Sequence, residues 1–344
     1  MSITYHERPG VYVEYDTTSR SASTAPRIVG IAAQGSGTGL YRFASAAAAA
    51  QTFSPSSTIG AMAQLAFGGG AAQVVCCPVN SVTDYDDAVS LLLDSGEADA
   101  IAMDCENAQA LGEIAELLCA EGTRECVAFL GLDFPTVQGL CSLAEDLNCE
   151  RMVLLGADVR LSGEQYCGGG WLAAAAMAGV YCAQTDPALP LSGAELPGLD
   201  AVSLSLSESE IDTLVRAGVT PLEAVGGLVR VIRAVTTRTT TGDTADGTWR
   251  ELSTVAIVDD VIPAVRDALR AKFLRRKNTA VTRNAIRAQA AIILDDRVRR
   301  EIIESYDSLT VEAVEGDPTT CEVSFGFRVV HGLERIHLSV HILV

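Results

Sequence analysis

The chain has 344 residues, of which 48% are hydrophobic and 5% aromatic. This length suits two packed domains, or one large domain with a smaller companion, and the composition favours a sizeable core and argues against a disordered chain. The formal net charge of −19 argues against a general nucleic-acid binder, which needs a basic surface. The longest apolar run, Trp171 to Ala183, is too short to cross a bilayer and predicts a buried helix.

Charge is distributed unevenly along the chain. From Asp84 to Asp212 there are 24 acidic residues and three arginines, a net charge of about −21. From Arg250 to Arg300 there are 12 basic and six acidic residues, a net charge of about +6. Two interpretations remain open: a solvated acidic domain beside a basic helical one, or a basic region that faces an acidic partner or cavity.

The first 26 residues predict an extended arm. A strand-like alternation runs through Val11, Tyr12, Val13 and Tyr15. The Ser- and Thr-rich stretch from Asp16 to Pro26 is typical of a linker. A strand isolated by a linker must pair with another strand, in its own subunit or in a different one.

Residues 27 to about 158 alternate between strand-like and helix-like segments. Strands are expected at Ile28–Ala33, Val74–Pro78, Ala100–Met103, Val127–Leu130 and Met152–Leu155. Helices are expected at Thr58–Phe67, Tyr85–Leu93, Ala108–Ala120, Val137–Leu147 and Gly170–Ala183. This succession predicts an α/β fold with a mostly parallel sheet that is covered by helices on both faces.

The last third predicts an α+β domain. Leu228–Val235 and Leu252–Ile257 are expected to be strands that flank an exposed loop, Thr236–Thr248. A helix is expected to start after Asp259-Asp260 with Pro263 in its first turn, and a second to run from about Thr282 to Glu304. Further strands are expected at Leu309–Val314, Glu322–Val330 and Arg335–Leu343.

The resulting domain plan has four parts. Residues 1–26 form the arm and linker, 27–203 the α/β domain, 204–330 the α+β domain and 331–344 a C-terminal arm strand. In that last strand one face is formed by Ile336, Leu338, Val340 and Ile342. The first helix of the α+β domain is basic and carries Arg266, Arg270, Lys272, Arg275, Arg276 and Lys277.

The sequence offers only weak candidates for an enzyme site. Gly35-Ser36-Gly37-Thr38-Gly39 is similar to a phosphate-binding loop but lacks the glycine spacing of a dinucleotide site and the lysine of a P-loop. The four histidines, at positions 6, 331, 337 and 341, leave the α/β region without one, which excludes a Ser-His-Asp or Cys-His site there. We expect no enzyme and no cofactor; the alternative is an α/β hydrolase or a nucleotide-binding enzyme.

The ten cysteines do not predict a metal site. None forms a C-x-x-C pair and none lies close in sequence to a histidine, so a zinc site is not expected. The first residues lack an apolar signal core. Without export, most of these cysteines are expected to be reduced core residues.

Three stretches resemble the sheath proteins of contractile phage tails, phage-tail-like bacteriocins and related injection systems. The first is Glu7-Arg8-Pro9-Gly10-Val11-Tyr12-Val13-Glu14. The second is Leu228–Thr237, followed after a loop by Trp249–Val255. The third is Phe325–Val330 with the final Ile336–Leu343 strand. In this order the three stretches span almost the whole chain, whereas the α/β middle matches only in its general pattern.

This resemblance implies a structural subunit. In such sheaths the terminal arms add strands to the sheets of adjacent subunits, and stacked hexameric rings surround an inner tube. Contraction drives the tube through a target envelope. The implied partners are other copies of the chain, the inner tail tube protein, and baseplate and tail terminator proteins, with no nucleic acid and no membrane insertion.

The resemblance also assigns roles and a location. The two arm strands are expected to link subunits, and the basic helix is expected to face the tube, unless it pairs within its own domain. The expected location is a virion tail or a phage-tail-like particle, assembled in the cytoplasm of the producing bacterium.

Overall fold

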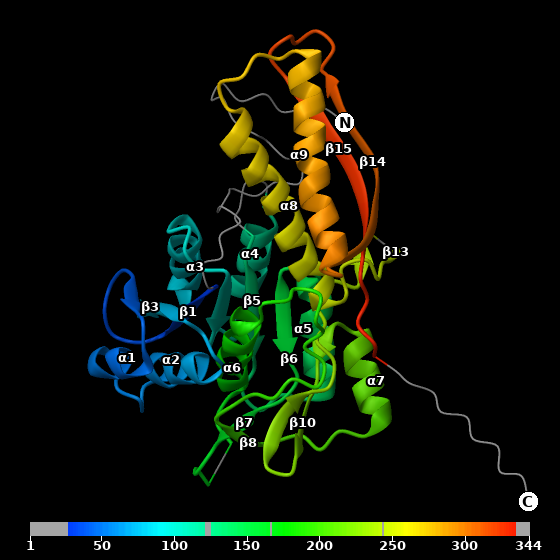
Figure 1. Ribbon diagram of the computed structural model, residues 1–344. Coiled ribbons are helices and arrows are strands. Elements are labelled where there is room, and N and C mark those ends of the chain that lie inside the picture. Colours follow the sequence, from blue (N-terminus) through cyan, green and yellow to red (C-terminus); the bar gives the residue numbers. More distant parts are fainter. Residues whose placement is uncertain (1–26, 121–124, 166, 243, 335–344) are drawn as a thin grey trace, which may run out of the picture.

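The computed structural model describes residues 27–120, 125–165, 167–242 and 244–334 (Figure 1). They form an α/β domain and, above it in Figure 1, a unit of two long helices and a long β-hairpin. The predicted arm strands, Val11–Tyr15 and Ile336–Ile342, lie outside the described residues.

The α/β domain is built on a seven-stranded sheet with the order β2-β3-β1-β4-β5-β6-β9. Its strands are β1 (Ile28–Gln34), β2 (Tyr41–Phe43), β3 (Gln73–Val79), β4 (Ala100–Met103), β5 (Val127–Gly131), β6 (Met152–Leu155) and β9 (Val219–Thr220). Every neighbouring pair is parallel except β2 and β3. The predicted α/β class is therefore confirmed. Through β9, the sheet also includes residues beyond the expected domain boundary at residue 203.

Helices cover both faces of this sheet. One face carries α1 (Ala46–Thr52), α2 (Thr58–Gly68) and α6 (Gly170–Ala183). The other carries α3 (Tyr85–Asp94), α4 (Ala108–Cys119), α5 (Val137–Leu147) and α7 (Glu208–Arg216). A single 3-10 turn, η1 (Val82–Asp84), precedes α3. Along β1, Val29 and Ile31 belong to one core and Ile28 and Ala32 to the other. Because both faces are buried, the strand is apolar without alternation, which is why it could be predicted from composition.

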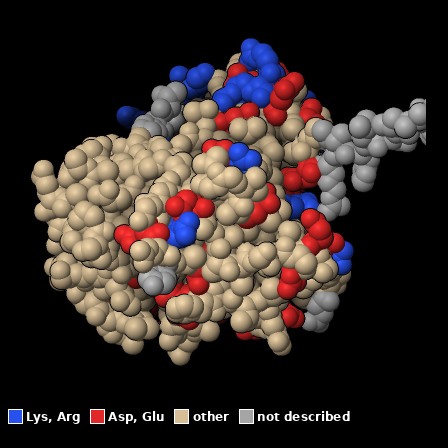
Figure 2. Space-filling view, turned by 90° about the horizontal axis from the view of Figure 1, so that it is seen from below, with Lys and Arg blue, Asp and Glu red and all other residues tan. Residues whose placement is uncertain are grey.

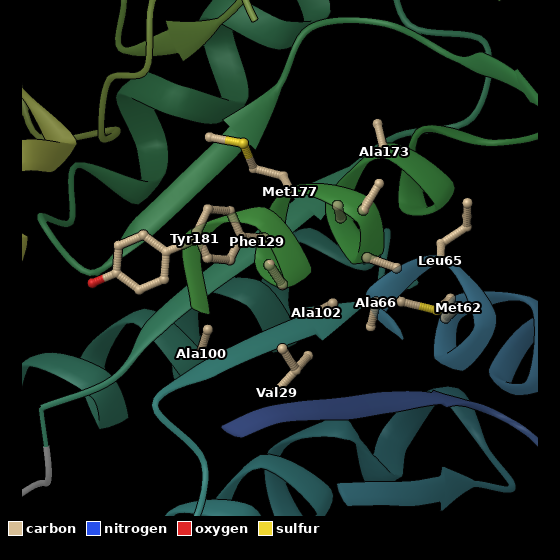
Figure 3. Packing of buried hydrophobic residues seen from close by; sticks show 14 of the residues in the cluster. Val29, Met62, Leu65, Ala66, Ala100, Ala102, Phe129, Ala173, Met177 and Tyr181 are labelled. Atoms are coloured by element: carbon tan, nitrogen blue, oxygen red, sulfur yellow. The ribbon is translucent and has the colours of Figure 1, made fainter. Parts of the chain in front are cut away.

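Helix α6 lies deep in the domain and packs closely on α2. Eleven of its residues are buried. A Cβ on Gly179 would stand 2.3 Å from the carbonyl oxygen of Ala66, so the two backbones can touch only because this residue is glycine. Figure 3 shows Tyr181 of α6 beside Phe129 of β5, with ring centroids 5.5 Å apart. Small residues and close backbones thus replace large rings in much of this core.

The described residues also form three smaller two-stranded antiparallel sheets. They consist of β7 (Val159–Leu161) with β8 (Leu199–Val202), β10 (Leu222–Val225) with β11 (Leu228–Val231), and β12 (Thr240–Thr241) with β13 (Thr244–Ala245), and α6 lies between β7 and β8 in the chain. The strand predicted at Leu228–Val235 therefore ends at Val231.

The prediction that Thr236–Thr248 is an exposed loop is partly wrong, because Thr236 and Thr237 are fully buried. Their hydroxyls donate to the carbonyl oxygens of Trp249 (2.7 Å) and Cys149 (3.0 Å). These hydrogen bonds satisfy the buried hydroxyl groups.

The strand predicted at Leu252–Ile257 is wrong, because these residues begin helix α8 (Leu252–Phe273). Pro263 therefore lies inside the helix and not in its first turn. Leu252 and Val255 pack into the α/β core, whereas Ile257 packs on the C-terminal hairpin. Burial against two different cores removes the one-sided apolar stripe by which an amphipathic helix is recognised.

The remaining elements largely follow the prediction. Helix α9 (Ala280–Arg299) starts where the Thr279 side chain accepts from the Thr282 amide, and it ends before the predicted Glu304. The strands β14 (Ile303–Ala313) and β15 (Cys321–Val329) confirm the predicted strand pair near the C-terminus. Glu304 belongs to β14 because Glu301, with φ of 57°, has already turned the chain.

Candidate assembly surface

The C-terminal unit has a small core that its own residues only half cover. Val265 and Leu269 of α8 pack with Ala290 and Leu294 of α9 and are buried. Apart from the buried Ile303, the hairpin residues against this core are only half-buried: Tyr306, Leu309, Val311, Cys321, Val323, Phe325, Phe327 and Val329. The hairpin packs on α9, but its apolar residues keep part of their surface exposed, which leaves room for contacts with a further chain.

The hairpin leaves both of its outer edges open. Its strands have 11 and 9 residues, and within the described residues they pair only with each other. Each strand therefore has one row of backbone N–H and C=O groups without a ladder partner in that part of the chain. Such edges are templates for the addition of another strand. An irregularity in the pairing lies between Asp307 and Thr310, where Ser308 has φ of 53°.

The predicted basic helix is only partly a helix. Helix α8 ends at Phe273, and Arg275, Arg276 and Lys277 lie in the connection to α9. Arg275 has φ of 67°, which marks the change of direction. Together with Lys272 they form an exposed cluster, here called the basic turn (Lys272, Arg275, Arg276 and Lys277). Arg270 is half-buried, and the Lys272 ammonium donates to the Gln289 side chain on α9.

Arg266 is not part of this exposed surface, because it pairs within its own subunit, which is the alternative that the sequence left open for the basic helix. It is 4% exposed, and its Nη1 lies 3.1 Å from Oε1 of Glu125. Its Nε lies 3.8 Å from Oδ1 of Asp267. A nearby pair joins Arg151 and Asp259, with 2.5 Å between nitrogen and oxygen. Burial raises the pKa of Asp259, and the charge of Arg151 opposes this shift.

These two pairs form what we call the charged joint (Arg266–Glu125 and Arg151–Asp259). Glu125 and Arg151 stand just before β5 and β6, and Asp259 and Arg266 belong to α8. The joint therefore fastens α8 to the end of the sheet where these strands begin. Because all four side chains are largely buried, each charge depends on its partner for stabilisation.

The opposite end of the sheet carries carboxylates, but their hydrogen bonds indicate a structural role. Asp104 accepts from the Gln34 amide at 3.0 Å and from the Tyr85 hydroxyl at 2.5 Å. Asp158 accepts from the Phe134 amide at 3.0 Å, and burial raises its pKa to about 6. Each carboxylate thus ties one strand end to a neighbouring segment.

The glycine-rich loop does not have the setting of a phosphate site. It leads into β2, a strand, whereas phosphate loops open a helix whose N-terminus faces the anion. Asp104 also accepts from Gln34 at the start of this loop, and its carboxylate would repel a phosphate. Of the histidines, His331 falls within the described residues, and it is exposed beyond β15.

One group of side chains offers metal-ligating atoms. These atoms, in Cys119, Cys149 and Glu150, lie within 4.8 Å of one another. Glu150 is already paired with Arg238 at 3.1 Å, which leaves the two sulfurs as the main feature of the group.

Among the described helices, none combines the length and apolarity needed to cross a membrane.

One end of the molecule is nearly uncharged. No Asp, Glu, Lys or Arg occurs between Arg42 and Asp84, a stretch that includes α1 and α2. Figure 2 shows a broad uncharged area at its left, on the same side as α1 and α2 in Figure 1. The charged residues of this view gather over the rest of the surface.

Comparison with known proteins places the open hairpin inside a recognised domain. Residues 244–342 match the family described as phage tail sheath C-terminal domain. This range includes α8, α9, β14 and β15. No curated protein matches the chain.

Solved structures resemble the chain over nearly its whole length. The helical sheath of the anti-feeding prophage in its contracted state has a TM-score of 0.73 and 16% identity, covering 98% of this chain and 99% of that one. The contracted sheath complex of PVC, an extracellular contractile injection system, has a TM-score of 0.72 and 15% identity, covering 99% of both chains. The crystal structure of a sheath tail protein from Desulfitobacterium hafniense has a TM-score of 0.66 and 11% identity, covering 96% of this chain and 100% of that one. The resemblance to tail sheath proteins is thus confirmed: residues 244–342 match the phage tail sheath C-terminal domain, and the chain has the fold of the sheath proteins in these solved structures.

Proposed function

We propose that this protein is the structural subunit of a contractile sheath. It polymerises as stacked hexameric rings around an inner tube and, on contraction, drives the tube through a target envelope. The open β14–β15 hairpin is the observation that carries this proposal, because both of its edges are unpaired among the described residues and it lies within the segment that matches the sheath family.

The two predicted arm strands are the partners we assign to these edges. Val11–Tyr15 and Ile336–Ile342 have strand periodicity and stand near the two ends of the chain. Strand addition supplies main-chain hydrogen bonds and fills side-chain positions on the receiving sheet. Arms from adjacent subunits that pair with β14 and β15 would extend a two-stranded sheet and help cover its half-buried core. The linker from Asp16 to Pro26 would let subunits move while they remain connected.

The other surfaces fit different neighbours. The uncharged area around α1 and α2 has no charge to desolvate and suits contact with another copy of the chain. The basic turn suits an acidic surface on the tube, and the acidic α/β domain suits an outer position. Baseplate and tail terminator proteins would contact the ends of the polymer, in a particle assembled in the bacterial cytoplasm.

Electron microscopy of the purified full-length protein tests the proposal. We expect rings or tubes at concentrations at which an ordinary enzyme remains a discrete particle. The matched comparison is the same protein without residues 1–20, which should fold but remain as single subunits. Discrete full-length particles that hydrolyse an ester or a nucleotide would instead favour the α/β enzyme.

The basic turn makes a second, separable prediction. Replacing Arg270, Lys272 and Arg276 with glutamate should weaken co-assembly with the tube protein, because attraction would become repulsion. Co-sedimentation with tube at low and high salt measures this effect. The control carries Arg216→Glu on α7 of the α/β domain, a charge reversal of the same sign at an exposed position away from the hairpin and the basic turn. Unchanged co-assembly of the triple variant would show that the basic turn does not face the tube.

A further inference from the structure

Two cysteines from different elements lie in close contact in the α/β domain. Cys119 is the last residue of α4, and Cys149 lies in the turn between α5 and β6. Their Sγ atoms are 2.9 Å apart. A disulfide bond is about 2.05 Å long, so the sulfurs need to approach by only about 0.9 Å to bond.

Cys149 is held on a rigid base. Its amide donates to the Thr237 hydroxyl at 3.0 Å, and that hydroxyl donates back to the Cys149 carbonyl oxygen at 3.0 Å. The preceding Asn148 caps α5 with φ of 36°, and its side-chain oxygen accepts from the amides of Thr239 and Thr240. Any closing movement therefore falls on Cys119, at the exposed end of α4.

The two thiols differ in acidity, and the difference favours Cys119 as the attacking group. The hydrogen bond between the two sulfurs holds the pKa of Cys119 below its usual value, and the charge of Arg151 adds to this effect. The same hydrogen bond, together with burial, raises the pKa of Cys149. The exposed sulfur is thus the more easily ionised one, and the thiolate is the attacking form.

We propose that Cys119 and Cys149 form an intramolecular disulfide when the protein meets a low-molecular-weight disulfide oxidant. The Cys119 thiolate attacks one sulfur of the oxidant, forming a mixed disulfide and releasing one thiolate, which takes up a proton. Cys149 then loses its proton and attacks the Cys119 sulfur, forming the protein disulfide and releasing the second thiol. Overall, two protein thiols are oxidised and one disulfide is reduced to two thiols, with no other reactant.

The other buried cysteines contrast with this pair. Burial raises the pKa of Cys76 to about 12 and that of Cys105 to about 11, which keeps both as unreactive thiols. Cys167 is exposed, but it makes no sulfur–sulfur contact with another cysteine of the described residues. Cys119 and Cys149 combine a short sulfur–sulfur distance with one thiol that ionises more easily.

The disulfide would cross-link two segments of the α/β domain next to the charged joint. It closes the chain from residue 119 to residue 149, which contains β5 and α5, and Arg151 of the joint follows Cys149 by two residues. A cross-link of this kind stabilises mainly by restricting the unfolded chain. The proposal does not depend on the sheath function, because it concerns only contacts within one subunit.

Peptide mapping of the full-length protein tests the proposal directly. The protein is incubated with oxidised glutathione, free thiols are alkylated, and the chain is cleaved after glutamate. Glu116 and Glu121 isolate Cys119, and Glu145 and Glu150 isolate Cys149 from Cys126 and Cys141. We expect a cross-linked peptide pair about 2 Da lighter than the sum of its two reduced peptides. We also expect a rise of several degrees in the unfolding temperature on oxidation.

Variants separate this outcome from its alternatives. Cys119→Ser should abolish both the cross-link and the rise in unfolding temperature, whereas Cys167→Ser, at an exposed site elsewhere, should keep both. A mixed disulfide on Cys119 that never resolves, or a cross-link from Cys119 to Cys126, would overturn the proposal. Stoichiometric zinc, retained by the wild-type protein and lost in Cys119→Ser, would assign the two sulfurs to a metal site and would also overturn it.

Discussion

Replacing Arg266 with methionine should lower the free energy of unfolding by about 3–5 kcal/mol, because the substitution removes one partner of a buried ion pair. Arg266 is 4% exposed, and the side chain of Glu125 is 11% exposed. Solvent can therefore do little to replace the lost charge. The urea midpoint of unfolding, followed by far-UV circular dichroism and tryptophan fluorescence, measures the loss. The protein without residues 1–20 is the suitable background, because polymers would stabilise the folded state by mass action.

Two further variants give this prediction a sharp control. Arg276→Met removes the same charge from the same region, but at an exposed position, and should change the free energy of unfolding by less than about 0.5 kcal/mol. Adding Glu125→Gln to Arg266→Met should recover part of the loss, since a neutral amide costs less to bury than a charged carboxylate. Equal stability of Arg266→Met and the wild type would mean that the charged joint contributes nothing to folding.

Replacing Val13 with proline should abolish polymerisation and leave the subunit folded. Proline has no N–H to donate and is tolerated in a strand only at special positions. The N-terminal arm is proposed to pair with a strand of another subunit, so the loss should appear in assembly and not in folding. Sedimentation and electron microscopy report assembly, and circular dichroism of the soluble fraction reports folding.

Thr18→Pro is the matched control for the arm. It places the same residue in the predicted linker, where proline is compatible with an extended chain, and should leave polymerisation intact. Hydrogen exchange then identifies the receiving edge. Amides of β14 and β15 should exchange more slowly in wild-type polymers than in Val13→Pro subunits, because added strands protect edge groups. Normal polymers from Val13→Pro would contradict strand addition by this arm.

The arms and the charged joint have complementary proposed roles. The arms are proposed to hold subunits together, whereas the joint fixes α8 to the α/β domain within a subunit. If contraction turns domains relative to one another, the joint determines which parts move as one body. A buried charge pair is suited to this task, because separating its partners is costly.

Prediction from sequence worked best where burial leaves a local signal. β4, β6, α5 and α6 have the expected boundaries, because strands buried on both faces are continuously apolar and the helices between them are bounded by polar or turn-forming residues. It failed at α8, whose apolar residues serve two cores and lose their helical period. It also failed at Thr236 and Thr237, where a polar composition indicates an exposed loop although tertiary hydrogen bonds bury both residues.

The candidate surface divides in the same way. The amino-acid sequence by itself determined the α/β class, the strand pair near the C-terminus, the segregation of charge and the resemblance to tail sheath proteins, because each depends on composition, local periodicity or short motifs. Only the tertiary structure decided that Arg266 is buried and that Cys119 touches Cys149. Their partners stand 141 and 30 residues away in the chain, and no local pattern encodes such a distance. It also decided that the hairpin edges are open within the described residues, since an unpaired edge is a property of the neighbours a strand lacks and not of its own side chains.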